Sequence, residues 1–156
     1  MAFDAFLKIE GIPGESTDDK HKNEIDVLSY SWGIARSIPQ RGGNGRAKVS
    51  DFSVVKFTDK ASPVLFDATC EGQHIPEATF TVRKAGASQQ TFLKYVFKEV
   101  IISSVQPSGT SGSESTVPTE SVSLNFGSVE ITYTPQGPNG QPLPPVTSNC
   151  NPGSNE

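Results

Sequence analysis

The sequence has 156 residues and a formal net charge of -4, from 17 acidic and 13 basic side chains. This length suits one domain with a single core, and the acidic balance predicts no general attraction to nucleic acid or to an anionic membrane. No apolar run approaches the roughly 20 residues that a membrane span needs, and residues 1–4 lack the basic and apolar segments of a secretory signal. We therefore expect a protein that folds in the cytoplasm, inserts in no membrane and, if it is secreted, leaves without such a signal.

Residues 3–10 are the first predicted strand, because apolar and polar side chains alternate there with a period of two. A second strand is expected at residues 25–37, where the two faces differ in side-chain size. One face would form part of a core, and the other is small and weakly polar. The first set is Leu28, Tyr30, Trp32 and Ile34, and the second is Val27, Ser29, Ser31, Gly33 and Ala35.

The small face of residues 25–37 admits two interpretations. A strand that faces solvent normally carries charged residues or Thr, because long charged side chains prevent wrong pairing. Small residues instead suit a face that lines a cavity, or one that packs tightly against a second sheet. Both interpretations fit these residues.

Residues 39–48, reading PQRGGNGRAK, predict an extended loop. Three glycines lie between Arg41 and Arg46, and glycines allow a loop to project and bend. A phosphate-binding loop would also need a Lys followed by Ser or Thr and then a helix, and the sequence has neither here.

One helix is predicted at residues 62–71. Ser62 is its expected N-cap, Pro63 occupies the first helical position, and Gly72 is placed to end it. A lone helix in a β-protein usually covers a sheet edge or caps an open barrel end, and we expect that here. Cys70 is expected as a free thiol on the apolar side of this helix.

Period-two alternation returns in three later segments, at residues 78–83, 122–126 and 129–133. Residues 92–105 form a longer apolar stretch in which the alternation slips at residues 99–100, so a bend is expected there. About seven short strands with turns between them indicate an all-β fold, either a sandwich or a small barrel.

Residues 136–156 form a C-terminal tail rich in Pro, Gly and Asn. Such a segment buries too little apolar surface to offset the entropy of ordering, so we predict that it is flexible. A disulfide between Cys70 and Cys150 would pin it to the domain, but cytosolic proteins seldom carry one. The folded domain is expected to cover residues 1–135.

The sequence offers no convincing active site. It has two histidines, and although Cys70 and His74 are four residues apart, a zinc site needs three or four ligands. Ser111 lies in a glycine-containing loop, but the glycine spacing differs from that of a nucleophile elbow and no apolar strand leads into it. We therefore predict a non-enzymatic protein without a metal or another cofactor.

Several separate motifs follow one another along the chain. In the first part these are IPGES at 12–16, EIDV at 24–27 and SWG at 31–33, with Asp18 and His21 between them. Later motifs are FTDK at 57–60, SP at 62–63, RKAG at 83–86, Glu120, LNF at 124–126 and YTP at 133–135. Together they cover about residues 1–135, and in type and spacing they resemble the Hcp family, the tube-forming proteins of bacterial type VI secretion.

The resemblance implies an all-β domain, a small β-barrel of two sheets with one flanking helix and an extended loop. It implies hexameric rings that stack into a tube. The partners it implies are a VgrG-type spike protein, contractile sheath proteins and small effector proteins held in the lumen. It also implies a protein that is cytoplasmic before firing and is then secreted by the type VI route.

Two groups of residues take roles from this resemblance. The small face is the candidate lumen wall and cargo contact, through Ser29, Ser31 and Gly33. The loop at 39–48 is expected to reach the adjacent ring. Its candidate stacking residues are Arg41, Gly42, Gly43, Asn44, Gly45 and Arg46. The alternative is a monomeric β-sandwich module that binds a peptide or a carbohydrate in an aromatic-lined cleft.

Overall fold

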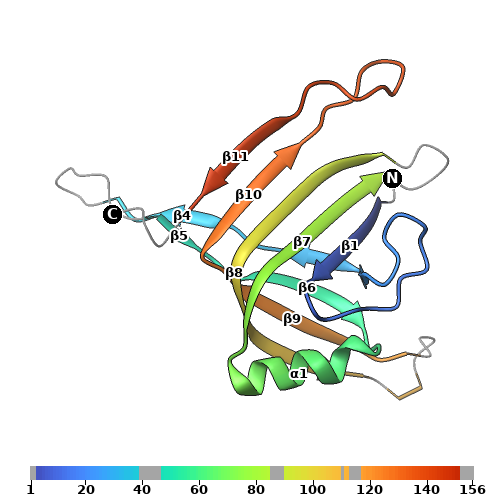
Figure 1. Ribbon diagram of the computed structural model, residues 1–156, viewed down its shortest axis with the longest axis vertical. Coiled ribbons are helices and arrows are strands. Elements are labelled where there is room, and N and C mark those ends of the chain that lie inside the picture. The colour runs from blue at the N-terminus through green and yellow to red at the C-terminus, as the bar shows by residue number, and fades with distance from the viewer. Residues whose placement is uncertain (1–2, 39–46, 85–89, 110, 113–116, 152–156) are drawn as a thin grey trace.

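The computed structural model describes residues 3–38, 47–84, 90–109, 111–112 and 117–151. Within these ranges it has eleven strands and one helix (Figure 1). In chain order the elements are β1 (Phe3–Ile9), β2 (Ile25–Val27), β3 (Ser29–Ser31), β4 (Ile34–Arg36), β5 (Ala47–Val49), β6 (Phe52–Phe57), α1 (Ala61–Glu71), β7 (His74–Lys84), β8 (Thr91–Ser108), β9 (Thr119–Asn125), β10 (Ser128–Tyr133) and β11 (Val146–Cys150). The predicted all-β fold with two sheets and one helix is confirmed.

Nine strands form one antiparallel sheet around the long strand β8. The path runs β2-β1-β7-β8-β9-β6-β3, with β10 and β11 added on one side, while β4 and β5 form a separate two-stranded sheet. β8 pairs with β10 through residues 93–98 and with β9 through residues 101–108. It therefore changes its neighbour along one edge, and the sheet divides there into two layers (Figure 1).

The change of neighbour coincides with a kink in β8 at Glu99. Glu99 has a φ of 55°, which lies outside the strand region, and its side chain is exposed like that of the preceding Lys98. The alternation shifts by one position, so that Phe97 and Val100 are both fully buried. The bend predicted at residues 99–100 is confirmed.

The two end strands of the main sheet, β2 and β3, are neighbours in the sequence. β2 pairs with β1, β3 pairs with β6, and Leu28 alone separates them. The Leu28 N–H donates to the Val55 carbonyl at 2.7 Å. Among the described residues no hydrogen-bonded ladder joins β2 to β3, so strand pairing does not close the main sheet into the small barrel that the resemblance implies.

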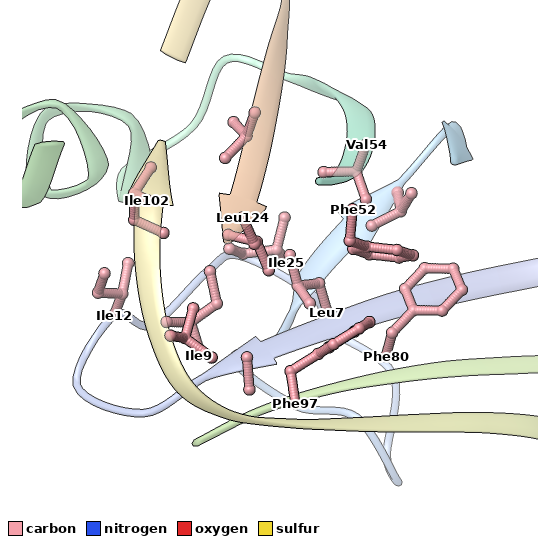
Figure 2. Packing of buried hydrophobic residues seen from close by; sticks show 14 of the residues in the cluster. Leu7, Ile9, Ile12, Ile25, Phe52, Val54, Phe80, Phe97, Ile102 and Leu124 are labelled. Atoms are coloured by element: carbon pink, nitrogen blue, oxygen red, sulfur yellow. The ribbon is translucent and has the colours of Figure 1, made fainter. Parts of the chain in front are cut away.

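Aromatic side chains fill the space between the two layers. Phe52, Phe80 and Phe97 from β6, β7 and β8 are fully buried. The ring centroid of Phe52 lies 5.0 Å from that of Phe80 and 4.7 Å from that of Phe97. Figure 2 shows these rings gathered with aliphatic residues such as Leu7 and Leu124. Burial of each ring contributes roughly 2 kcal/mol relative to an exposed position, so this cluster is a principal source of stability.

Helix α1 packs along the lower layer of the sheet (Figure 1) and buries Ala61, Leu65 and Ala68. Gly72 follows it with a φ of 63°, in the left-handed region that favours glycine, as predicted. The prediction for Cys70 is wrong in one respect, because this free thiol is exposed instead of lying on the buried side of the helix.

The start of α1 also differs from the prediction. The helix begins at Ala61, and Lys60 instead of Ser62 is the N-cap residue. The Ala61 N–H donates to Asp59 Oδ1 at 3.0 Å, so a carboxylate just before the helix satisfies one donor of its first turn. Ser62 Oγ accepts the Asp59 N–H at 3.0 Å and donates to Glu120.

Part of the C-terminal tail at 136–156, which is predicted to be flexible, forms a strand at residues 146–150. β11 pairs antiparallel with β10, with Val146 opposite Tyr133. Backbone groups of this segment find partners on a neighbouring strand, which Pro and Gly content cannot indicate. Most residues of β11 are exposed.

Candidate functional site

The segment from β2 to β4 differs from the single strand that the sequence predicts. Leu28 is 45% exposed and Ile34 is 61% exposed, so two residues assigned to the core face lie outside the core. Tyr30 and Trp32 do pack against the core, as predicted. Val27, assigned to the small face, is buried in β2. The buried and exposed positions exchange at Leu28. On one side of this residue the chain pairs with β1, and on the other side it pairs with β6.

The three candidate lumen residues, Ser29, Ser31 and Gly33, are all exposed. Ser29 and Ser31 are two residues apart in β3 and therefore share one face of the sheet. Gly33 is fixed just beyond β3, because its N–H donates to Ser50 Oγ at 2.8 Å and its carbonyl accepts the Ser50 N–H at 2.9 Å.

Strand register extends the face of Ser31 across four strands. Ser31 lies opposite Ser53 of β6, and Ser53 lies opposite Ser123 of β9. Ser123 in turn lies opposite Ser104 of β8. The hydroxyl oxygens of Ser53 and Ser123 are 2.9 Å apart. Because opposite residues of an antiparallel pair share a face, these four serines form one continuous row.

A second row runs beside the four serines and is also uncharged. It joins Ser29, Val55, Ser121 and Gln106 through the same three strand pairs. On each strand, the residue that separates the two rows points inward. Val54, for example, lies between Ser53 and Val55 and is fully buried. We call the two rows of four residues together the seryl face.

The outer face of the other layer carries charges. Lys98 of β8 lies between Glu77 of β7 and Ser128 of β10, and Glu130 of β10 lies opposite Val96. Opposite charges at facing positions stabilise strand pairing by roughly 0.2–1 kcal/mol. The two outer faces of the protein therefore differ in chemistry, because the seryl face carries mostly short hydroxyl side chains and no charge.

β4 and β5 form an arm outside the main sheet, at the left of Figure 1. All three residues of β4 are exposed, and Ile38 just beyond it is 77% exposed. At the base of the arm, Trp32, Val49, Ile131 and Cys150 are among the residues that line an apolar cavity of about 180 Å³. A two-stranded ribbon alone is marginally stable in water, so this arm is suited to contact with another molecule.

The six residues predicted to stack rings, 41–46, lie outside the described residues. So does most of the loop predicted at 39–48. Ala47 and Lys48, the last two residues of that loop, belong to β5. The described part of the predicted loop is therefore one strand of the arm.

A cluster around Arg83 fixes the loop between β1 and β2 to the outside of the sheet. Arg83 is 3% exposed and donates to both carboxylate oxygens of Asp18, to Oδ1 at 2.9 Å. The hydrogen bond from Arg83 lowers the pKa of Asp18 to about 2. In the same loop the His21 ring stacks on Phe6, with centroids 4.3 Å apart, and Nδ1 of His21 lies 3.0 Å from Glu24 Oε2.

The sequence alone does not predict this contact between the loop and the sheet, because Asp18 and Arg83 are 65 positions apart. Within the described ranges, no group of three or more His, Cys, Asp and Glu side chains is placed to hold a metal ion. The helix found in the described part of the chain lacks the length and apolar character to cross a membrane.

Comparison with known proteins agrees with this fold over nearly the whole chain. The family model described as "Type VI secretion system effector, Hcp" matches residues 6–133. Protein hcp1 of Pseudomonas aeruginosa is 43% identical over 145 residues, which cover 90% of this chain and 88% of that protein.

Solved structures show the same relationship. Hcp1 from Salmonella typhimurium matches with a TM-score of 0.82 at 40% identity, over 100% of this chain and 99% of that chain. A structure described as a type six secretion system protein matches with a TM-score of 0.92 at 32% identity, over 99% of both chains. This chain therefore belongs to the Hcp family of type VI secretion system proteins.

Proposed function

We propose that this protein is a ring-forming subunit of the type VI secretion tube, assembled as a hexamer. The arm is the main observation behind this proposal. β4 and β5 form a sheet separate from the main one, and the side chains of Ile34 and Ile38 are 61% and 77% exposed. Apolar surface displayed in this way gains stability when another molecule covers it. A ring closes through a heterologous interface, in which one patch of a subunit meets a different patch of its neighbour.

The rings stack into the inner tube that is expelled with a VgrG-type spike protein. The segment at residues 39–48, which follows β4 and ends within β5, reaches the adjacent ring. Arg41 and Arg46 meet carboxylates there, in a chain that carries 17 Asp and Glu. Rim contacts of this kind set register more than affinity.

The seryl face lines the lumen, with Ser29 and Ser31 at its β3 side and Gly33 just beyond β3. Short hydroxyl side chains donate and accept hydrogen bonds, but they offer neither a formal charge nor a large apolar contact. Such a wall suits small effector proteins that must be held in the ring and later released. The contrast with the charged outer face of β7, β8 and β10 supports this choice of lumen side.

Membership of the family supports the remaining parts of this role. The subunit resides in the cytoplasm before firing, inside a sheath of contractile proteins. It then leaves the cell by the type VI route together with the spike. Its task is structural, and catalysis belongs to the effectors that it carries.

Light scattering and negative-stain microscopy test the proposed assembly. The expected result is the mass of a hexamer together with ring-shaped particles. A monomer at every protein concentration would contradict the proposal and favour the alternative, a monomeric β-sandwich module that binds a peptide or a carbohydrate.

A further inference from the structure

We infer that the connection between β10 and β11 carries a recognition segment, residues 142–145, for a partner protein with an uncharged groove lined by aromatic side chains. Figure 1 shows this connection at the end of the β10–β11 hairpin, at the top of the view and across the molecule from α1. The inference is independent of ring formation, because it concerns a surface of the single folded chain.

The sequence of this segment restricts its backbone to an extended form. Residues 142–145 read PLPP, and the ring of each proline fixes φ at about -65°. A residue that precedes a proline is kept out of the helical region, so the one non-proline residue, Leu143, is restricted as well. These restrictions are typical of the polyproline II helix, which has about three residues per turn, and they place Pro142 and Pro145 on one face.

The segment is exposed to solvent, and part of its backbone has no partner. Every residue from 141 to 149 is exposed. Within the described part of the chain, no hydrogen bond reaches the carbonyl oxygen of Leu143 or of Pro144. Trp and Tyr side chains combine an apolar ring with a hydrogen-bond donor. A groove lined by them can therefore pack against the prolyl rings and donate to these two oxygens.

The base of the connection is fixed, so the segment is presented in a defined position. The Leu143 N–H donates to the Pro135 carbonyl at 2.8 Å. Gln136 Nε2 donates to Gln90 Oε1 at 3.0 Å, which ties the connection to the residue before β8. A ligand that is already held in place loses less entropy on association, and a proline side chain has no rotamer freedom to lose.

The absence of charge selects the kind of groove. Residues 131–155 include no Asp, Glu, Lys, Arg or His. SH3, WW and EVH1 domains all bind proline-rich segments, but an SH3 groove also pairs its acidic side chains with a basic residue that flanks the prolines of its ligand. Those acidic side chains would stay unpaired against this segment. The partner therefore has an uncharged aromatic groove, like that of a WW domain.

Exposed apolar side chains beside the segment enlarge the surface. Tyr133 of β10 lies directly opposite Val146 of β11, the residue that follows the segment. Their side chains are 49% and 65% exposed. Because opposite residues of an antiparallel pair share a face, the two form one apolar pair next to the prolines. A partner docked on the segment gains further contact by covering this pair.

Isothermal titration calorimetry of the full chain against a panel of purified WW domains tests the inference. At least one domain should bind, and a synthetic polyproline peptide should compete with the protein for it. Pro142→Ala and Pro145→Ala each remove a ring from the shared face and should raise Kd about tenfold, as truncation of an anchoring side chain does. Pro138→Ala, at an exposed proline of the same connection outside the segment, is the matched control and should leave Kd unchanged.

A further variant keeps every proline and tests the argument from charge. Leu143→Glu should weaken binding to the WW domain several-fold, because it brings a carboxylate into an apolar groove. Its backbone N–H, which donates to Pro135, is retained. A purified SH3 domain should bind the unmodified protein several-fold more weakly than the WW domain. Circular dichroism melts confirm that each variant is folded.

Three results would overturn this inference: no binding by any WW domain of the panel, binding that the polyproline peptide does not displace, or an equal loss of affinity for Pro138→Ala. Tighter binding by the SH3 domain would overturn the assignment of an uncharged groove. None of these results bears on ring formation, which light scattering measures separately.

Discussion

Lys56 of β6 and Glu120 of β9 form an ion pair in the protein interior, directly opposite each other in the strand ladder. Their side chains are only 1% and 2% exposed. Lys56 Nζ also donates to Asp59 Oδ1 at 2.9 Å and to Ser62 Oγ at 3.3 Å. A buried charge is tolerated when it is paired and hydrogen-bonded. This cluster meets that condition, and it ties β6 and β9 to the start of α1.

Loss of one partner of this pair should be more damaging than loss of both. Lys56→Met is expected to lower the free energy of unfolding by about 3–5 kcal/mol, because it leaves Glu120 buried without its principal cation. Adding Glu120→Leu should recover much of that loss, since both charges are then gone. Guanidinium unfolding followed by the fluorescence of Trp32, at one protein concentration, measures both variants. Equal instability of the single and double variants would contradict this explanation.

Cargo retention should depend on the whole seryl face and not on Ser31 alone. Ser31→Tyr and Ser123→Tyr are each expected to reduce the amount of small effector that co-purifies with the ring several-fold, because a bulky ring then projects from the lumen wall. The native mass of the ring should stay unchanged. Thr132→Tyr, on the outer face of β10 opposite Lys94, is the matched control. If Ser31→Tyr changes neither rings nor cargo, the lumen assignment is wrong.

The loop between β4 and β5 should act in stacking and not in ring closure. Deletion of residues 42–45 is expected to leave hexamers intact and to shorten or abolish tubes, because the basic loop then no longer spans the gap between rings. Sedimentation velocity and negative-stain images measure the two assembly levels separately. Loss of the hexamer itself would assign the loop a different role.

Alternation in the sequence predicts strands well where a strand keeps the same neighbours. Residues 3–10 and 122–126 are of this kind, and the bend at Glu99 is visible because the alternation itself slips there. At Leu28 the prediction fails, since the chain passes from one end of the sheet to the other and the buried face changes with it. The capping role expected of Ser62 fails for a similar reason, because its hydroxyl bonds to Glu120, which is 58 positions away.

Only part of the candidate site could be predicted from the sequence. Ser29 and Ser31 stand out because a strand of small residues is unusual at a protein surface. Ser121 and Ser123 also alternate with buried residues, which indicates a polar outer face for β9. The register that aligns Ser31 with Ser53 and then with Ser123 depends on strands far apart in the sequence, and local pattern cannot supply it.

The pair of Asp18 and Arg83 should make stability depend on pH in the acid range. The pKa of Asp18 falls from 3.8 to about 2 in the folded protein, so folding favours the carboxylate. Its contribution is complete above a pH of about 4 and is lost as the pH falls through about 2. Asp18→Asn should therefore lower Tm at neutral pH, and the difference from the unmodified protein should vanish near pH 2.

Circular dichroism melts over this pH range measure the effect, with Asp19→Asn as the matched control. Asp19 neighbours Asp18 in the same exposed loop, but the hydrogen bonds of Arg83 go to Asp18 and Asp4. A difference in Tm for Asp18→Asn that stays constant down to the lowest pH would mean that its effect comes from packing and not from charge.

Gly14, in the loop between β1 and β2, lies close against the backbone of residues 24 and 25. Its N–H donates to the Asn23 carbonyl at 2.7 Å. A Cβ added at Gly14 would lie 2.5 Å from the carbonyl oxygen of Glu24 and 2.8 Å from the Cα of Ile25. Both are backbone atoms, one just before β2 and one at its first residue, and they cannot move aside as a flexible side chain can.

Gly14→Ala is therefore expected to lower the free energy of unfolding by about 1–3 kcal/mol, the usual cost of overpacking. Gly33→Ala is the matched control, because no atom lies within 4 Å of a Cβ added there, and its effect should stay within about 0.5 kcal/mol. Denaturant unfolding of both variants decides the matter. Equal stability of the two variants would mean that the loop shifts freely. A loss of stability for Gly14→Ala alone shows that the loop is held against β2, whose residue Ile25 is buried in the core.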